Sequence, residues 1–378
     1  MLKALRCVMN NIKFWIKGAR IYTLPIGLVP VVMAGVVAIR VVKNSYCFIS
    51  STNVFRLIIQ FILCIGIALF LQISVNYAND YCDGIKGLDD NRNLRNTVNN
   101  DFQKKNKSSL CDVSWKLADA GITRHQVRNS MIICALCGCL CGLIAIVISG
   151  LWLFILIGIL CLASAWFYAG GKHPYGYYGF GEISAFTFFG PVAFIGTLCI
   201  IFYGIGISNH IVINSPLSSF ACVAMSFIPG GCSACLMMIN NLRDINVDKN
   251  HGKLTAMVRI GEKAGQTLCS YVVVMVLVFM TFYSVASLIF PSFMPSVWHF
   301  GVNFKDGLIQ GFAFNTFRLC LFISQCILQL AVLAIMFIKG ISLIRVLHKS
   351  DYKRAFPLCV SVSMLTAIST LLFLLSIL

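Results

Sequence analysis

Two runs of asparagine and aspartate have the residue types and spacing needed to bind a divalent cation. The first contains Asn76, Asn79, Asp80, Asp83 and Asp89, and the second contains Asn240, Asn241, Asp244 and Asp248. Residues four positions apart lie on one face of a helix, so Asn79 would lie beside Asp83, and Asp244 beside Asp248. Mg²⁺ prefers carboxylate and amide oxygens, and it typically bridges protein carboxylates to the phosphate oxygens of a substrate. The two runs therefore predict a site for Mg²⁺ and a phosphate-containing substrate.

Basic residues lie within and near these runs. Such side chains could bind phosphate oxygens whose negative charge the metal does not neutralise. The candidates are Lys86, Lys172, Arg243 and Lys253. The alternative is that the acids are solvated side chains paired locally with Lys and Arg, which is the usual fate of charges at helix ends. Two clusters of similar composition and spacing on one side of a membrane favour the metal site.

Membrane-spanning helices must position these residues. The chain of 378 residues is 58% hydrophobic and 11% charged, with a mean hydropathy of +0.85, whereas soluble domains carry about 25% charged residues. A bilayer-crossing helix needs about 20 mostly apolar residues. Nine stretches qualify: Tyr22 to Ile39, Val54 to Ala78, Ser130 to Ile148, Leu151 to Ala169, Ile183 to Ile205, Leu217 to Ile239, Thr267 to Phe290, Leu319 to Ile338 and Phe356 to Leu378. Only Ser149 and Gly150 are left to form the turn between the third and the fourth stretch.

The distribution of charge predicts how the chain lies in the bilayer. A net charge of +17 in a soluble chain would suggest a nucleic-acid partner. Here, with a cytoplasmic N-terminus, most of the 30 Lys and Arg residues fall on the cytoplasmic side, as the positive-inside rule expects. Every acid except Asp306 falls there too. We therefore expect the lipid bilayer and not nucleic acid as a partner, with the C-terminus on the opposite side.

The segments outside the spans are expected to belong to one membrane-embedded domain, residues 1–378. Residues 1–20, interrupted by basic side chains, predict an amphipathic segment on the membrane surface. Residues 90–120 form an elongated cytoplasmic loop. Residues 168–182 are rich in glycine, which permits close backbone approach, and in tyrosine, whose ring can face a cation. These tyrosines could equally belong to an interfacial aromatic belt.

With these motifs the sequence resembles the UbiA-type intramembrane prenyltransferases, which carry two Asp-rich motifs after their second and sixth helices. The first motif, Asn79-Asp80-Tyr81-Cys82-Asp83 with Lys86-Gly87-Leu88-Asp89, has the longer spacing of the branch that uses a naphthoate acceptor. The second motif, Asn240-Asn241-Leu242-Arg243-Asp244 with Asp248, Gly252-Lys253 and Thr255, fits the same branch. So does the middle loop, Pro174-Tyr175-Gly176-Tyr177 with Gly181-Glu182-Ile183.

The resemblance implies an all-α, polytopic membrane protein with nine transmembrane helices in a bundle and a central cavity that opens to the cytoplasmic face. It implies Mg²⁺-dependent transfer of a polyprenyl group from polyprenyl diphosphate to 1,4-dihydroxy-2-naphthoate with decarboxylation. This is a step of menaquinone biosynthesis in the bacterial inner membrane. The implied metal ligands are Asn79, Asp83, Asp89, Asn241, Asp244 and Asp248. Of these, the catalytic candidates are Asn79, Asp83, Asp244 and Asp248, and the candidates for substrate contact and cation shielding are Asn76, Tyr168, Tyr175 and Tyr178.

Two alternatives stay open at this point. A related enzyme could use another acceptor, such as 4-hydroxybenzoate or haem, but the spacing of the first motif argues against it. A transporter would carry ionisable residues near the bilayer midplane, whereas here the acids lie at one face. The chain also departs from the family after Asp89, where the loop is longer and lacks a Gly-Pro pair. The sequence therefore does not decide whether Arg92 or Arg95 reaches diphosphate.

Overall fold

The computed structural model describes residues 15–16, 18–45, 50–85, 124–171, 173–206, 216–289 and 308–372. Within these ranges the chain is helical and contains no strand. Several predicted features lie outside the described residues: Lys86, Asp89, Lys172, the loop at residues 90–120 with its two arginines, and most of the segment at residues 1–20. The expected all-α class is confirmed.

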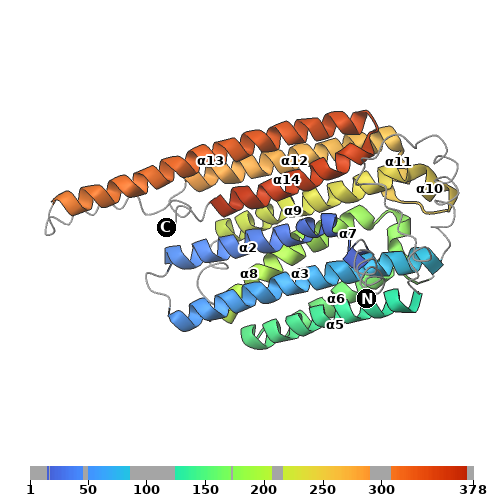
Figure 1. The fold of residues 1–378 in the computed structure, drawn as a ribbon, viewed down its shortest axis with the longest axis horizontal. Helices are drawn as coiled ribbons and strands as arrows, with labels where there is room; N and C mark the ends of the chain where they lie inside the picture. Colours follow the sequence, from blue (N-terminus) through green and yellow to red (C-terminus); the bar gives the residue numbers. More distant parts are fainter. Residues whose placement is uncertain are drawn as a thin grey trace, which may run out of the picture.

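Long helices form most of the structure (Figure 1). They are α2 (Leu24–Ser45), α3 (Ser51–Ile85), α5 (Arg124–Ser149), α6 (Phe154–Ala169), α9 (Pro216–Arg243), α12 (Glu262–Ile289), α13 (Leu308–His348) and α14 (Tyr352–Leu371). The fifth predicted span is a continuous run of α7 (Gly181–Thr187), the π-helical turn η3 (Phe188–Val192) and α8 (Ala193–Gly204). Shorter elements are η1 (Ile21–Thr23), η2 (Tyr175–Tyr178), α10 (Ile245–Asn250) and α11 (Ala256–Ile260). The π turn contains Pro191, which has no N–H to donate to a regular helical turn.

Eight helical segments of the described chain are long and apolar enough to cross a membrane. The predicted fourth span begins at Phe154 instead of Leu151, so α6 has only 16 residues. Its length is about 24 Å, less than the hydrocarbon core of about 30 Å. The predicted count of nine is therefore not confirmed. The prediction that Ser149 and Gly150 alone form the preceding turn is wrong. Helix α5 includes Ser149, and residues 150–153 make the turn with Gly150 at a φ of 73°.

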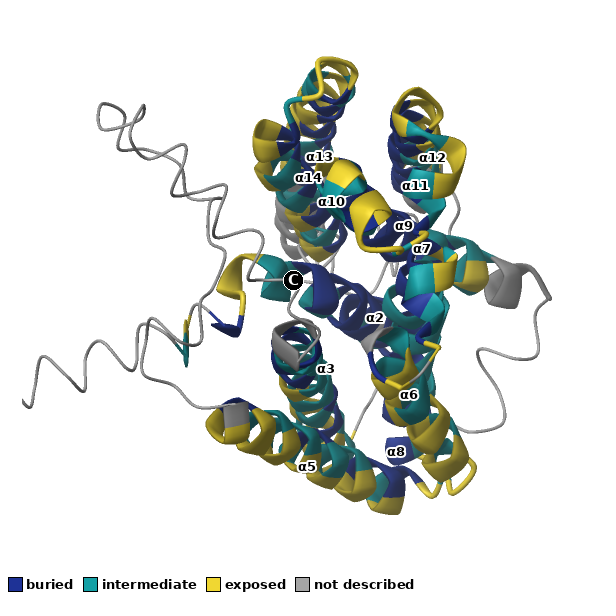
Figure 2. Ribbon diagram, turned by 90° about the vertical axis from the view of Figure 1, so that its right-hand side faces the viewer, coloured by how far each residue is buried: buried dark blue, intermediate teal, exposed yellow. Residues whose placement is uncertain are grey.

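Helices α2 and α9 form the centre of the bundle. In each, 72% of the most apolar stretch is buried, against 11% in α3 and 17% in α5. Helix α2 lies against α3, α8, α9 and α14, and α9 also packs on α7 and α12. Figure 2 shows the buried residues concentrated in α2 and α9, while α5 and α6 carry exposed outer faces. Those faces are apolar, with Leu136 and Ile159 more than half exposed, as expected for helices in contact with lipid.

Two glycines bring α9 unusually close to the fifth span. A Cβ atom added at Gly190 would lie 2.7 Å from the carbonyl oxygen of Ser226 and 2.8 Å from the Cα atom of Gly230. Small residues permit this approach between membrane helices, where close packing replaces the hydrophobic effect as the main attraction. The two segments are antiparallel, because Gly190 meets Gly230 while Glu182 meets Asn241. The start of α7 is therefore held against the end of α9.

The helices that carry the two Asn/Asp motifs end at the same end of the bundle, where Figure 1 places α10 and α11. We call this the motif end. Helix α3 continues as far as Ile85, so Asn79 and Asp83 are one turn apart in the same helix.

Candidate active site

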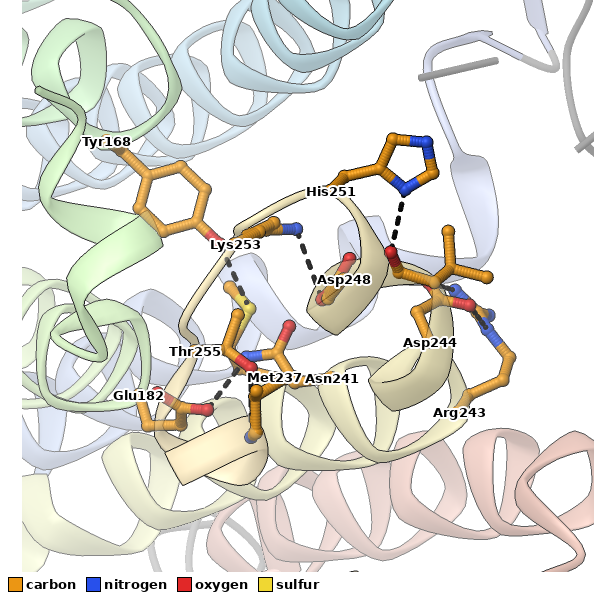
Figure 3. A network of polar contacts seen from close by, with 12 residues as sticks. Tyr168, Glu182, Met237, Asn241, Arg243, Asp244, Asp248, His251, Lys253 and Thr255 are labelled. Carbon is orange, nitrogen blue, oxygen red and sulfur yellow. Dashed lines mark hydrogen bonds and ion pairs between the residues drawn. The ribbon is translucent and has the colours of Figure 1, made fainter. Parts of the chain in front are cut away.

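The second motif crosses the junction between α9 and α10 (Figure 3). Asp244 leaves the α-helical conformation, with φ −96° and ψ 8°. The backbone N–H of Asp244 still donates to Asn240 O at 3.1 Å, and that of Asp248 donates to Asp244 O at 2.9 Å. The helical spacing is therefore kept across the junction. Asn241 and Asp248 are buried, with 7% and 4% of their surfaces exposed.

A tight turn after α10 brings Lys253 back to Asp248. Gly252 adopts a φ of 70°, which only glycine adopts without strain, and the N–H of Lys253 donates to Asp248 O at 2.9 Å. Lys253 Nζ then lies 3.5 Å from Asp248 Oδ2 and 5.4 Å from the centre of the Tyr177 ring. Thr255 caps α11 by accepting a hydrogen bond from Val258 N. A candidate metal ligand and a candidate diphosphate-binding lysine are thus in contact.

Asp244 and Arg243 pair with each other. Arg243 Nε and Nη2 donate to the two carboxylate oxygens of Asp244 at 3.0 and 2.8 Å. Both side chains are more exposed than that of Asp248. Figure 3 shows this pair on the far side of Asp248 from Lys253. The structure therefore does not place Asp244 beside Asn241 and Asp248 as a third buried oxygen donor, and a metal-binding role for Asp244 stays a prediction.

Glu182 is a buried carboxylate at this site to which the sequence analysis assigned no role. Its Oε1 atom accepts a hydrogen bond from Asn241 Nδ2 at 2.7 Å. Glu182 is 4% exposed, and no described residue donates a hydrogen bond to its Oε2 atom. A sequence signal did exist, since a carboxylate stands at the start of an apolar span. Its partner, however, is 59 positions away in the chain.

The three candidate tyrosines have different surroundings. Tyr168 donates to Met237 Sδ at 3.3 Å, one turn before Asn241 on α9, and meets the Tyr175 ring edge-on at 5.8 Å. Tyr175 forms hydroxyl contacts with Ser164 at 2.7 Å and Ser184 at 2.9 Å. The third, Tyr178, is 45% exposed and contacts His173. Tyr168 therefore contacts α9 one turn before the second motif, and the Tyr175 ring packs against it.

Residues that precede α2 are attached to the first motif. Arg20 Nη2 pairs with Asp80 Oδ1 at 2.7 Å. Asn76 Nδ2 donates to Ala19 O at 2.9 Å, and Tyr77 OH donates to Trp15 O at 3.0 Å. We call this set of contacts the N-terminal clasp. It gives Asn76 a structural partner, and the contact of Asn76 with substrate stays a prediction. Asn79, one turn from Asp83, is only partly buried.

The donor atoms at the second motif suit a hard cation. No group of three or more His, Cys, Asp or Glu side chains capable of holding a metal occurs in the part of the chain that the structure describes. The second motif instead offers the Asp248 carboxylate and the amide oxygen of Asn241. The amide nitrogen of Asn241 already donates a hydrogen bond to Glu182. An all-oxygen set with one or two carboxylates is what Mg²⁺ uses when water and substrate phosphate complete its coordination. The residues present therefore fit Mg²⁺.

Comparison with known proteins identifies the family. The model of the UbiA prenyltransferase family matches residues 41–304. A 1,4-dihydroxy-2-naphthoate octaprenyltransferase of Mycobacterium tuberculosis is 34% identical over 254 residues, 67% of this chain and 72% of that protein. One from Escherichia coli is 31% identical over 198 residues, 51% of this chain and 54% of that protein. The apo structure of a UbiA homolog from Aeropyrum pernix aligns over 92% of this chain and 96% of that one, at 14% identity and a TM-score of 0.49. The chain belongs to the UbiA prenyltransferase family.

Proposed function

We propose that the protein transfers a polyprenyl group from polyprenyl diphosphate to 1,4-dihydroxy-2-naphthoate, with decarboxylation, to give demethylmenaquinol and diphosphate. Relatives that bear the name 1,4-dihydroxy-2-naphthoate octaprenyltransferase support this acceptor. The observation that carries the proposal is the contact of Lys253 with buried Asp248, beside Asn241, at one end of an apolar helical bundle. Such an arrangement suits a substrate with an anionic head and a hydrocarbon tail.

We assign binding of the diphosphate head to both motifs. Asn79, Asp83 and Asp89 on one side, and Asn241, Asp244 and Asp248 on the other, would hold Mg²⁺. When bound, Mg²⁺ supplies charge neutralisation for the departing diphosphate. Lys253 is held beside Asp248 and directs its ammonium group at the same region, where it would bind a diphosphate oxygen. Lys86, Lys172 and Arg243 are assigned the same role from the sequence.

The steps that follow departure of the diphosphate require a carbocation to be shielded from water more than they require a proton-transfer residue. Breaking the bond between C1 of the prenyl group and the diphosphate oxygen leaves an allylic cation. The electron-rich naphthoate ring attacks that carbon, and CO₂ and a proton are lost. The faces of Tyr168 and Tyr175, supported edge to face beside α9, would stabilise the cation and exclude water. The apolar faces of the helices would hold the tail.

We also propose that the enzyme lies in the bacterial inner membrane with its N-terminus and its motif end in the cytoplasm. The excess of Lys and Arg on the loops at that side supports this orientation. The water-soluble naphthoate and the diphosphate head would then both arrive from the cytoplasm.

The decisive experiment uses the purified full-length chain in lipid nanodiscs. It would be given polyprenyl diphosphates of several lengths and a panel of acceptors: 1,4-dihydroxy-2-naphthoate, 4-hydroxybenzoate and haem. Each reaction is run with and without Mg²⁺, and products are identified by mass. We expect a prenylated, decarboxylated product only from the naphthoate and only with Mg²⁺. Product from another acceptor alone would overturn the proposed substrate, and no product from any acceptor would overturn the proposed activity.

A further inference from the structure

Glu182 is one of only two glutamates in the chain, and its burial requires an explanation. Removing a carboxylate from water is costly unless partners compensate for the lost hydration. Here the compensation is incomplete, because Oε1 accepts one hydrogen bond from Asn241 while no described residue donates to Oε2. A link between α7 and α9 alone would not need a charged group, since two neutral side chains could make it.

The hydrogen bond fixes which way the Asn241 amide points. An amide group has two donors on nitrogen and an acceptor on oxygen, whereas an ionised carboxylate only accepts. With Nδ2 at 2.7 Å from Glu182 Oε1, the amide oxygen must point elsewhere. Turning the amide over would place two acceptor oxygens against each other at that distance. Figure 3 shows the amide oxygen on the side of Asp248 and Lys253.

The backbone around this contact leaves little room for adjustment. Gly190 and Gly230 hold the fifth span against α9 at near-contact distance, and Glu182 lies about two helical turns from Gly190. Lys253 also attracts the Glu182 carboxylate electrostatically while pairing with Asp248. Glu182, Asn241, Lys253 and Asp248 thus form one connected group.

We propose that Glu182 is a positioning residue, which orients the amide oxygen of Asn241 toward the cation that binds with the prenyl diphosphate. The inference rests on the proposed function, because it assumes a divalent cation at the second motif. Glu182 itself does not touch the substrate in this assignment. Residues that orient a metal ligand by a hydrogen bond typically change metal affinity by ten- to a hundredfold when replaced.

The substitution Glu182→Gln separates positioning from simple attachment. A glutamine of the same length can either accept from Asn241 or donate to it, so the link between α7 and α9 is kept while the amide is free to turn over. We therefore expect a melting temperature close to that of the wild type. We expect Mn²⁺ affinity, measured by electron paramagnetic resonance on the full chain in nanodiscs, to fall about tenfold. The Mg²⁺ concentration that half-saturates prenyl transfer should rise in parallel.

Two further variants complete the test. Glu262→Gln is the matched control, because Glu262 is also a hydrogen-bonded carboxylate, accepting from Ser350 and Tyr352, but it bonds to no residue of the second motif. Its Mn²⁺ affinity should equal that of the wild type. The double variant Glu182→Gln with Asn241→Asp reverses the polarity of the bond: the new amide donates to the new carboxylate, which keeps one oxygen for the cation. It should recover most of the affinity.

The outcomes distinguish this inference from the proposed function. If the wild type binds Mn²⁺ and transfers prenyl groups, but Glu182→Gln has unchanged Mn²⁺ affinity and Mg²⁺ dependence, the positioning role is overturned and the function stands. Failure of the double variant to recover affinity, in a protein that melts normally, also overturns it. A wild type that neither binds Mn²⁺ nor requires Mg²⁺ for transfer overturns the Mg²⁺-dependent function, and this inference with it.

Discussion

Substituting Gly190 by alanine should separate α9 from the fifth span and weaken the site from a distance. The new Cβ atom would lie 2.7 Å from Ser226 O and 2.8 Å from Gly230 Cα, whereas ordinary contacts begin at 3.4 Å. Both neighbours are backbone atoms, which cannot rotate away. The two segments must therefore move apart by about 0.7 Å to relieve both contacts, a strain of the kind that costs about 1–3 kcal/mol in a well-packed core.

The same movement acts on the contact between Glu182 and Asn241. That hydrogen bond is 2.7 Å long, and a displacement of about 0.7 Å at the helix pair would carry it beyond the usual N–H···O range, which ends near 3.2 Å. We expect Mn²⁺ affinity to fall along with stability. A disturbance of packing alone would lower stability and leave the affinity of the folded protein unchanged.

Gly196→Ala is the matched control. Gly196 lies in α8, six residues farther along the same continuous run, and a Cβ atom there meets nothing within 4 Å. Both variants add one methyl group to this run, so the control shows the effect of that group where it meets no neighbour. The assays are thermal unfolding in nanodiscs and Mn²⁺ titration. Should Gly190→Ala match Gly196→Ala in both, the argument that the glycine contact positions the site is refuted.

Three other changes test separate parts of the structure. Lys253→Met should raise the KM for prenyl diphosphate about tenfold or more, since a charge-assisted hydrogen bond to phosphate contributes about 1.5–3 kcal/mol. The KM for the naphthoate should stay constant. The control is Lys263→Met, at an exposed lysine. Arg20→Ala should lower the free energy of unfolding by no more than about 1 kcal/mol, because the Arg20 side chain is 44% exposed and water screens its pair with Asp80. Faster proteolysis near residue 20 would report that the residues before α2 have come away from α3. Unchanged cleavage would contradict a role for the N-terminal clasp. Chelating divalent cations with EDTA should abolish product formation in the mass assay, and Mg²⁺ should restore it; transfer that persists in EDTA would exclude the metal-binding role of the motifs.

The helical class, most of the spans and the helical register of both motifs could be predicted from sequence, because hydropathy and the 3.6-residue period are local properties of the chain. The α5–α6 turn was predicted wrongly for the same reason. Leu151, Trp152 and Leu153 are apolar, so hydropathy assigned them to a span, although the chain uses them to reverse direction.

The partners of the site residues could not be predicted in the same way. Asp80 pairs with Arg20 across 60 positions, and Asn241 with Glu182 across 59. Such pairs depend on which helices become neighbours, and spacing along the chain carries no information about this. From the sequence alone, the carboxylate and amide oxygens within each Asn/Asp motif could not be told apart. The fold distinguishes them, burying Asp248 and leaving Asp244 to pair with Arg243.

The unequal burial of the motif-bearing helices has a consequence for how the enzyme depends on its membrane. Helix α9 is mostly enclosed by protein, whereas most of α3 is not buried by the rest of the chain and would face lipid in a bilayer. A change in bilayer thickness or lipid composition would therefore tilt α3, and the first motif with it, before it disturbs α9. Under the proposed function, cation binding by the second motif would then persist in bilayers that already slow prenyl transfer. A thin or thick bilayer should therefore uncouple the two.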